Sequence, residues 1–138
     1  MNKAVRPIVE VVITALSGFG AFIAPIVLDP PAAWPQAPLF PIVREAVENV
    51  RPGSFIALAI VGLLAGVLAS AHWVLLGLAA VVLFPLCTIA EMIADPTSHN
   101  LFPFEFVMYA VFSIPAVVAA GLGRVARTVV LARGRPQA

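Results

Sequence analysis

The sequence predicts an all-α integral membrane protein, a four-transmembrane-helix bundle with a short extracytoplasmic amphipathic helix between the first two spans. Three observations lead to this prediction. Hydrophobic residues make up 62% of the chain and charged residues 11%, whereas a soluble domain has roughly half apolar and about a quarter charged residues. Four apolar stretches approach the roughly 20 residues that a membrane-crossing helix needs. The charges between these stretches are sorted by sign, so we treat residues 1–138 as a single membrane domain.

The first span is predicted over 7–28. Pro7 suits a first helical position, where a missing N–H is no loss, and Pro30 and Pro31 stop the helix because proline cannot continue the hydrogen-bond ladder. A basic start followed by an apolar run also resembles a cleaved signal peptide. However, Glu10 interrupts the run, and Phe22 occupies a position where a cleavage site needs a small residue. We therefore expect a retained helix.

A stiff, proline-rich connection at 30–41 leads to a short amphipathic helix predicted over 41–51. We expect this helix to lie in the interface plane or on top of the bundle. Its apolar residues follow helical spacing, and polar residues occupy the other side: Leu39, Val43, Val47 and Val50 against Arg44, Glu45, Glu48 and Asn49.

The apolar stretch at 54–94 is too long for one span and long enough for two. A turn near His72 divides it into spans predicted over 54–71 and 73–94. The fourth span is predicted over 104–122, and it continues as a basic helical extension through Arg133. Pro85 and Pro115 lie inside the third and fourth spans, and each is expected to kink its helix.

The distribution of charge predicts the orientation of the chain. Cytoplasmic flanks of membrane helices are rich in Lys and Arg, and an even number of spans places both termini on one side. We therefore expect a multi-pass protein with cytoplasmic N and C termini. The basic residues gather near the termini, namely Lys3, Arg6, Arg124, Arg127, Arg133 and Arg135, and most acids lie at the two long connections, namely Asp29, Glu45, Glu48, Glu91, Asp95 and Glu105.

Small residues at a spacing of four predict close helix packing. In lipid, helices associate through such faces because burying leucine provides no driving force. The pairs are Gly62 with Gly66, Gly20 with Ala24, and Ala116 with Ala120. They predict packing within the chain, and the alternative is a protein partner or a homo-oligomer.

Besides these, the expected partner is the lipid bilayer, and a net charge of +1 gives no reason to expect nucleic acid.

Ionisable groups inside a bilayer are costly, so each one suggests a function. Glu10 lies about one turn into the first span, with Arg6 one turn before it. Arg124 and Arg127 are expected at the same depth on the fourth span. We predict that these charges pair and lock the first span to the fourth, and the alternative is a proton or cation site.

A second group of polar residues marks the extracytoplasmic end of the third and fourth spans: Glu91, Asp95, His99, Asn100 and Glu105. Glu91 and Asp95 are four residues apart and share a helix face, where their repulsion calls for a positive partner such as Arg44 or Arg51. We interpret the group as turn and capping residues, with a ligand or partner site as the alternative. No cofactor is predicted. The alternative is a divalent cation held by Glu91, Asp95 and His99.

These features favour a non-catalytic protein over an enzyme, because the sequence has no Ser–His–Asp order and no G-x-S-x-G, C-x-x-C or glycine-rich phosphate motif. The preferred hypothesis is a structural, assembly or accessory subunit of a membrane complex. The first alternative is an oligomeric channel or transporter. The second is a membrane enzyme or metal-binding protein that uses the extracytoplasmic acidic and histidine group.

Overall fold

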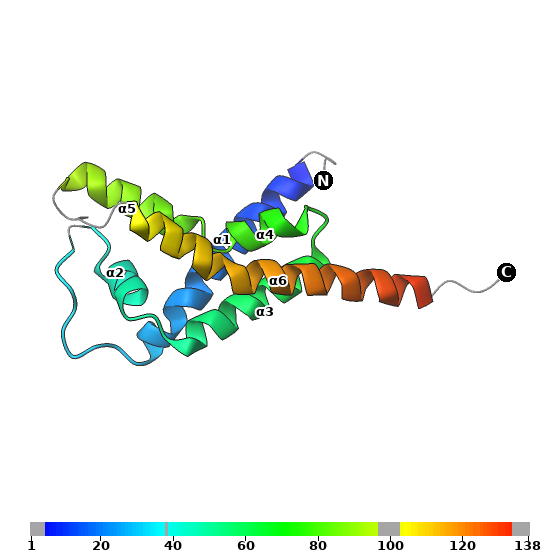
Figure 1. Ribbon diagram of the computed structural model, residues 1–138, viewed down its shortest axis with the longest axis horizontal. Helices are drawn as coiled ribbons and strands as arrows, with labels where there is room; N and C mark the ends of the chain where they lie inside the picture. Colours follow the sequence, from blue (N-terminus) through cyan, green and yellow to red (C-terminus); the bar gives the residue numbers. More distant parts are fainter. Residues whose placement is uncertain (1–4, 38, 97–102, 134–138) are drawn as a thin grey trace.

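The computed structural model describes residues 5–37, 39–96 and 103–133, and all regular secondary structure in these ranges is helical. Figure 1 shows an elongated bundle. By length and composition, α1 and α6 can each cross a membrane, and up to four crossings result if each of the bent pairs α2–α3 and α4–α5 is one span. The predicted all-helical class is confirmed. The six helices are α1 (Val5–Leu28), α2 (Pro41–Glu48), α3 (Pro52–Leu68), α4 (Trp73–Ala79), α5 (Leu83–Ala94) and α6 (Phe104–Arg133).

Prolines begin the two helices that follow the first connection. Pro41 starts α2 and Pro52 starts α3, since a first helical residue needs no N–H donor. The axes of α2 and α3 differ by 101°, so α2 turns across the bundle instead of extending α3. Its buried residues include Val43 and Val47, as expected, but Glu45 is also buried, with 8% of its surface exposed. The expectation that Glu45 lies on the polar face is therefore wrong.

The third predicted span is not continuous. The axes of α4 and α5 meet at an angle of 42°. Pro85 has no N–H to donate to the carbonyl of Val81, and the chain tightens at this point. The amides of Val81, Val82 and Phe84 each donate to the carbonyl three residues earlier, at 3.1–3.2 Å. The expected kink at Pro85 thus takes the form of a break one turn before the proline.

The small-residue faces of α3 and α6 pack against each other. A side chain on Gly62 would overlap the backbone of Ala116, and one on Gly66 would overlap the backbone of Ala120. The absence of a Cβ is what lets the two backbones approach. These two faces are therefore occupied within the chain, whereas Gly20 on α1 has open space beside it.

Aromatic side chains fill the core between the helices. Phe22 of α1 lies 4.7 Å from Phe84 of α5 and 5.5 Å from Phe112 of α6, measured between ring centroids. Tyr109 joins this cluster, and its hydroxyl lies 2.6 Å from the hydroxyl of Thr88. These two hydroxyls inside the core are thus paired with each other, as an apolar environment requires.

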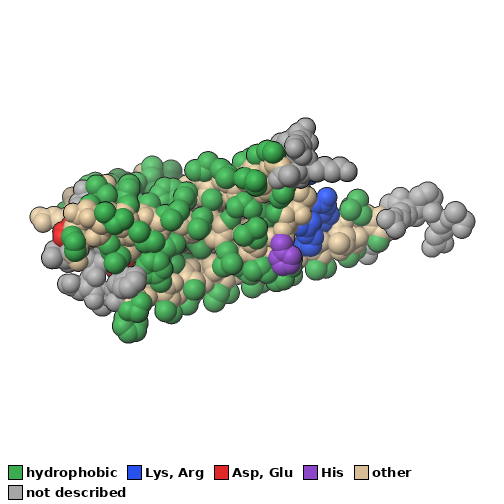
Figure 2. All heavy atoms as spheres, turned by 90° about the horizontal axis from the view of Figure 1, so that it is seen from above, with side chains coloured by type: hydrophobic (Ala, Val, Ile, Leu, Met, Phe, Trp, Pro, Cys, Tyr) green, Lys and Arg blue, Asp and Glu red, His purple; other side chains and the backbone are tan. Residues whose placement is uncertain are grey.

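The outer surface is apolar along most of its length. Figure 2 shows a broad hydrophobic band with Lys or Arg side chains toward one end and Asp or Glu at the other. The start of α1 and the end of α6 both point toward the right in Figure 1, the side on which Figure 2 shows the Lys or Arg side chains. The last turns of α6 extend beyond the other helices.

Candidate functional site

The turn between α3 and α4 is the centre of a polar network. Ala69, Ser70 and Ala71 lie in this turn, between the last residue of α3 and the start of α4. The Ala69 amide still donates to the Ala65 carbonyl of α3, at 2.9 Å. Helix ends carry amide and carbonyl groups that need partners from elsewhere. Here charged side chains from α1 and α6 supply those partners, and we call this region the basic end: Arg6, Glu10, Ser70, Arg124 and Arg127.

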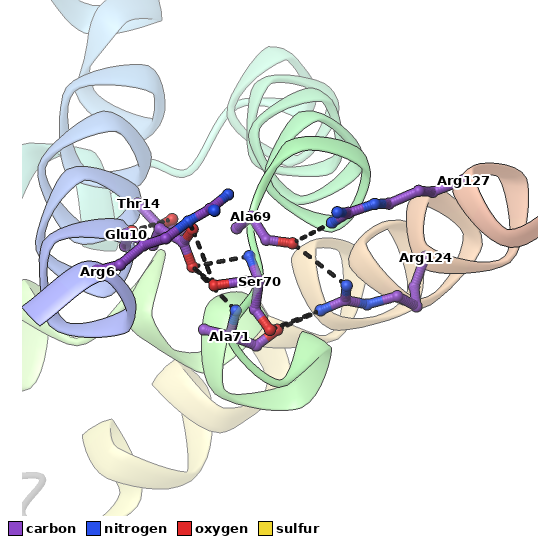
Figure 3. A network of polar contacts seen from close by, with 8 residues as sticks. All are labelled: Arg6, Glu10, Thr14, Ala69, Ser70, Ala71, Arg124 and Arg127. Carbon is purple, nitrogen blue, oxygen red and sulfur yellow. Dashed lines mark hydrogen bonds and ion pairs between the residues drawn. The ribbon is translucent and has the colours of Figure 1, made fainter. Parts of the chain in front are cut away.

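Glu10 supplies the acceptors. Its carboxylate accepts hydrogen bonds from the amides of Ser70 and Ala71, at 2.8 and 2.9 Å, and from the Ser70 hydroxyl at 2.9 Å. Arg6 donates from Nε to the same carboxylate at 2.9 Å. The Glu10 side chain is 15% exposed, and Figure 3 shows it pointing from α1 into the turn. A carboxylate can accept several charge-assisted bonds at once, so Glu10 holds α1 against the turn.

Two arginines of α6 supply the donors on the other side of the turn. Arg127 donates to the carbonyl of Ala69 at 2.7 Å. Arg124 donates to the carbonyls of Ala69, Ser70 and Ala71. The amides of the turn thus bind a carboxylate and its carbonyls bind guanidinium groups, which satisfies both kinds of backbone group.

The four charged residues predicted to pair at this end therefore all lie around one turn. Arg6 forms an ion pair with Glu10, whereas Arg124 and Arg127 bond to backbone carbonyls. The first and last helices are joined through the turn and not by a direct ion pair. Ser70 is the residue that sequence reasoning did not assign to the site. Its one sequence cue is a hydroxyl that interrupts the apolar stretch at 54–94, close to the predicted turn.

A groove opens beside this network, between α1 and α3. Its volume is about 330 Å³ and its surface is mainly apolar. Glu10 and Ala69 lie at the basic end of it. We call it the α1/α3 groove, and it is lined by Glu10, Ile13, Thr14, Ser17, Val61, Leu64, Ala65, Leu68 and Ala69.

The opposite end of the bundle holds a second cavity, of about 270 Å³, between α2, α5 and α6. Glu91 and Glu105, both predicted as site residues, line it together with Arg44 and Glu48. Glu91 is 4% exposed, and it accepts a hydrogen bond from the amide of Phe40 at 2.8 Å. We call Arg44, Glu48, Glu91 and Glu105 the acidic end.

Arg44 supplies positive charge to this cavity. Its Nε donates to Glu48 at 2.8 Å. The pKa of the Arg44 guanidinium is raised above its usual value, chiefly by the hydrogen bond to Glu48, and also by the negative charges of Glu48, Glu91 and Glu105. The cavity therefore contains acids and a cation that balance one another in part.

Of the other predicted site residues that the structure describes, Asp95 is not brought into this cavity. Asp95 follows the last residue of α5, where its amide donates to the Glu91 carbonyl at 2.8 Å, and it does not line the cavity. His99 and Asn100 lie outside the described residues. Among residues 5–37, 39–96 and 103–133, no group of three or more His, Cys, Asp and Glu side chains is arranged to hold a metal ion.

Comparisons with protein-family models, with curated proteins and with solved structures found no match. The chemistry of both ends is therefore inferred from this chain alone. At the basic end, charged side chains bind backbone groups of a turn. At the acidic end, charged side chains surround a cavity.

Proposed function

We propose that the chain crosses the membrane four times and serves as a structural, assembly or accessory subunit of a membrane complex. The four crossings are α1, α3, the bent pair α4–α5, and α6. Helix α2 lies at the extracytoplasmic surface, and both termini face the cytoplasm.

The network at the basic end supports the number of crossings. It brings together the first turns of α1, the turn after α3 and the last third of α6. At the other end, Arg51, just before α3, donates to the carbonyl of Pro25 at 2.7 Å and to the Asp29 carboxylate at 2.9 Å, near the end of α1. The successive helices thus run back and forth between the same two ends of the bundle, as the proposed four crossings require.

The sorting of charge supports the orientation. Arg6, Arg124 and Arg127 lie at the end where α1 begins and α6 ends, and positive flanks stay in the cytoplasm. The acids Glu48, Glu91 and Glu105 lie at the other end. The orientation therefore follows from the positive-inside rule once the helices share two common ends.

The observation that carries the structural role is the use of the charged groups at the basic end. Glu10, Arg124 and Arg127 each bond to the backbone of one turn, and so they tie three helices into one unit. The apolar band outside this unit (Figure 2) suits contact with lipid or with other membrane helices. An apolar body whose helices are tied together by charged side chains fits a scaffold or accessory subunit.

Reporter fusions test the topology. A reporter active only in the cytoplasm is expected to be active at the N terminus, at the C terminus and at the Ser70 turn, and inactive in the connection at 30–40. A reporter active only outside the cytoplasm gives the reverse pattern. Reporters that place the two termini in opposite compartments would overturn the four-crossing proposal.

Purification from native membranes in mild detergent tests the role. We expect one defined partner protein at a constant ratio, quantified by mass spectrometry against an unrelated tagged membrane protein of similar size. Homo-oligomers that conduct ions in vesicles would contradict this proposal and favour a channel. A stoichiometric divalent metal lost on Asp95→Ala substitution would favour the metal-dependent alternative.

A further inference from the structure

The α1/α3 groove has the properties of a site for a lipid chain. Its volume of about 330 Å³ lies within the range of small-molecule sites, about 300–1,000 Å³. Its walls include the exposed side chains of Ile13, Leu64 and Leu68. In the proposed membrane orientation these walls face the bilayer, so the groove is open to lipid along its length.

Two arginines with unused donors bond to residues that line this groove at its basic end, although neither arginine is itself part of the lining. Arg6 bonds to Glu10, which lines the groove, through Nε alone, and Arg127 bonds to Ala69, also of the groove, through Nη1 alone. A guanidinium has five N–H donors, so within the described residues both side chains retain donors for a ligand. Figure 3 shows Arg6 and Arg127 reaching toward the same turn from opposite sides.

The charge at this end favours an anion. Arg6, Arg124 and Arg127 outnumber the single carboxylate of Glu10, so the basic end has a net positive charge. Arg6 is half exposed, at 51% of its side-chain surface, and can reach a headgroup. Guanidinium groups bind phosphate through paired hydrogen bonds, and basic pockets between membrane helices on the cytoplasmic side bind phosphorylated lipid headgroups.

We propose that the α1/α3 groove binds an anionic phospholipid from the cytoplasmic leaflet. Arg6 and Arg127 bind its phosphate, and one acyl chain lies in the groove. The two arginines are joined to the apolar groove through Glu10 and Ala69, which line it. An apolar groove next to cationic groups favours a lipid over free phosphate. The inference rests on the membrane crossing proposed above, and it adds a ligand to the accessory role.

Native mass spectrometry of the detergent-purified protein tests the site, with phosphatidylglycerol and phosphatidylcholine added in equal amounts. We expect retained phosphatidylglycerol to exceed phosphatidylcholine by at least about tenfold, which corresponds to about 1.4 kcal/mol. The double substitution Arg6→Gln with Arg127→Gln is expected to abolish this preference. The matched control is Arg44→Gln, at the acidic end, which is expected to keep it.

A second pair of variants tests the acyl-chain site. Ser17 is exposed inside the groove, and Leu16 is exposed beside it but does not line it. Ser17→Phe is expected to fill the groove and reduce retention of both lipids severalfold, whereas Leu16→Phe is expected to leave retention unchanged. Because both positions are exposed, neither substitution disturbs the core, and circular dichroism in detergent checks that each variant folds.

Several outcomes would overturn the inference. The first is equal retention of the two lipids by the wild-type protein, and the second is a preference that survives the double arginine substitution. Retention unaffected by Ser17→Phe would overturn the assignment of the acyl chain to the groove. Release of the protein from membranes by alkaline carbonate would instead refute the proposed membrane crossing, so the two failures are distinguishable.

Discussion

The two ends of the bundle use the same residue types in different ways. At the basic end, Glu10, Arg124 and Arg127 bond to the backbone of a single turn. At the acidic end, Arg44 and Glu48 bond to each other on one turn of α2 and leave a cavity beneath them. Charged side chains thus hold three helices together at one end of the bundle and line a cavity at the other.

This difference has a consequence for stability. Backbone amides and carbonyls in the turn need partners wherever water is excluded, so removing a charged side chain at the basic end leaves several polar groups unsatisfied. Removing one member of an exposed pair on a helix surface leaves the other member hydrated. We therefore expect substitutions to cost more at the basic end.

The largest effect is expected for Glu10→Ala. The amides of Ser70 and Ala71 and the Ser70 hydroxyl lose their acceptor, and an unsatisfied group of this kind costs about 1–3 kcal/mol. We expect the free energy of unfolding to fall by about 2–3 kcal/mol in total, because the bonds between Glu10 and Ser70 are exposed and water rehydrates some of these groups. Unfolding in a mixed detergent–SDS titration measures the change.

The matched control is Glu48→Ala at the acidic end. Glu48 is 52% exposed and forms an i,i+4 pair with Arg44, and such a pair contributes about 0.3–0.5 kcal/mol. Equal losses of stability in the two variants would contradict the distinction between the ends. A greater loss in Glu48→Ala would reverse it.

A smaller and more local effect is expected for Glu91→Ala. Glu91 is buried and accepts from the amide of Phe40, directly before α2, so its removal frees the start of α2 from α5. We expect hydrogen exchange to rise by about tenfold at Phe40 and over α2, equivalent to about 1.4 kcal/mol in local opening. The amides of Ser70 and Ala71 are expected to be unaffected.

Ile93→Ala is the control for this prediction, since Ile93 lies on the same helix and is 78% exposed. It is expected to leave exchange over α2 unchanged. Faster exchange at both ends in Glu91→Ala would mean that the two ends are coupled, and the comparison between them would fail.

Helix positions were predictable from the sequence because apolar length and proline act locally. Pro41 is the first residue of α2 and Pro52 is the first residue of α3. Gly62 and Gly66 mark a helix face that packs closely. The break between α4 and α5 was less predictable. A proline predicts a kink, but the break also depends on close contacts, such as that between Gly18 and Ala80, which join segments far apart in the chain.

The partners of the charged residues were the hardest to predict. Glu10, Arg124 and Arg127 could be placed at one depth from their positions in the spans. Their partners are backbone groups of residues 69–71. A turn near His72 was predicted, but every residue carries backbone groups, so no sequence pattern assigns these groups to Glu10, Arg124 and Arg127. The same holds for the bond between Glu91 and the Phe40 amide.

The smallest effect is expected for Arg44→Gln, at the acidic end, and the way its stability loss varies with pH tests which group controls that end. Arg44 is 28% exposed and its main partner is the exposed Glu48, so we expect a loss of about 0.3–0.5 kcal/mol. The pKa of Arg44 is raised above its usual value, so its contribution is fully present throughout the neutral range and is lost only as the pH rises through the higher pKa of the folded state. The stability difference between wild type and variant is therefore expected to stay constant from about pH 6 to about pH 9 and to shrink as salt is added. A difference that changes with pH within this range, measured by the same detergent–SDS titration, would mean that another titrating group controls the acidic end.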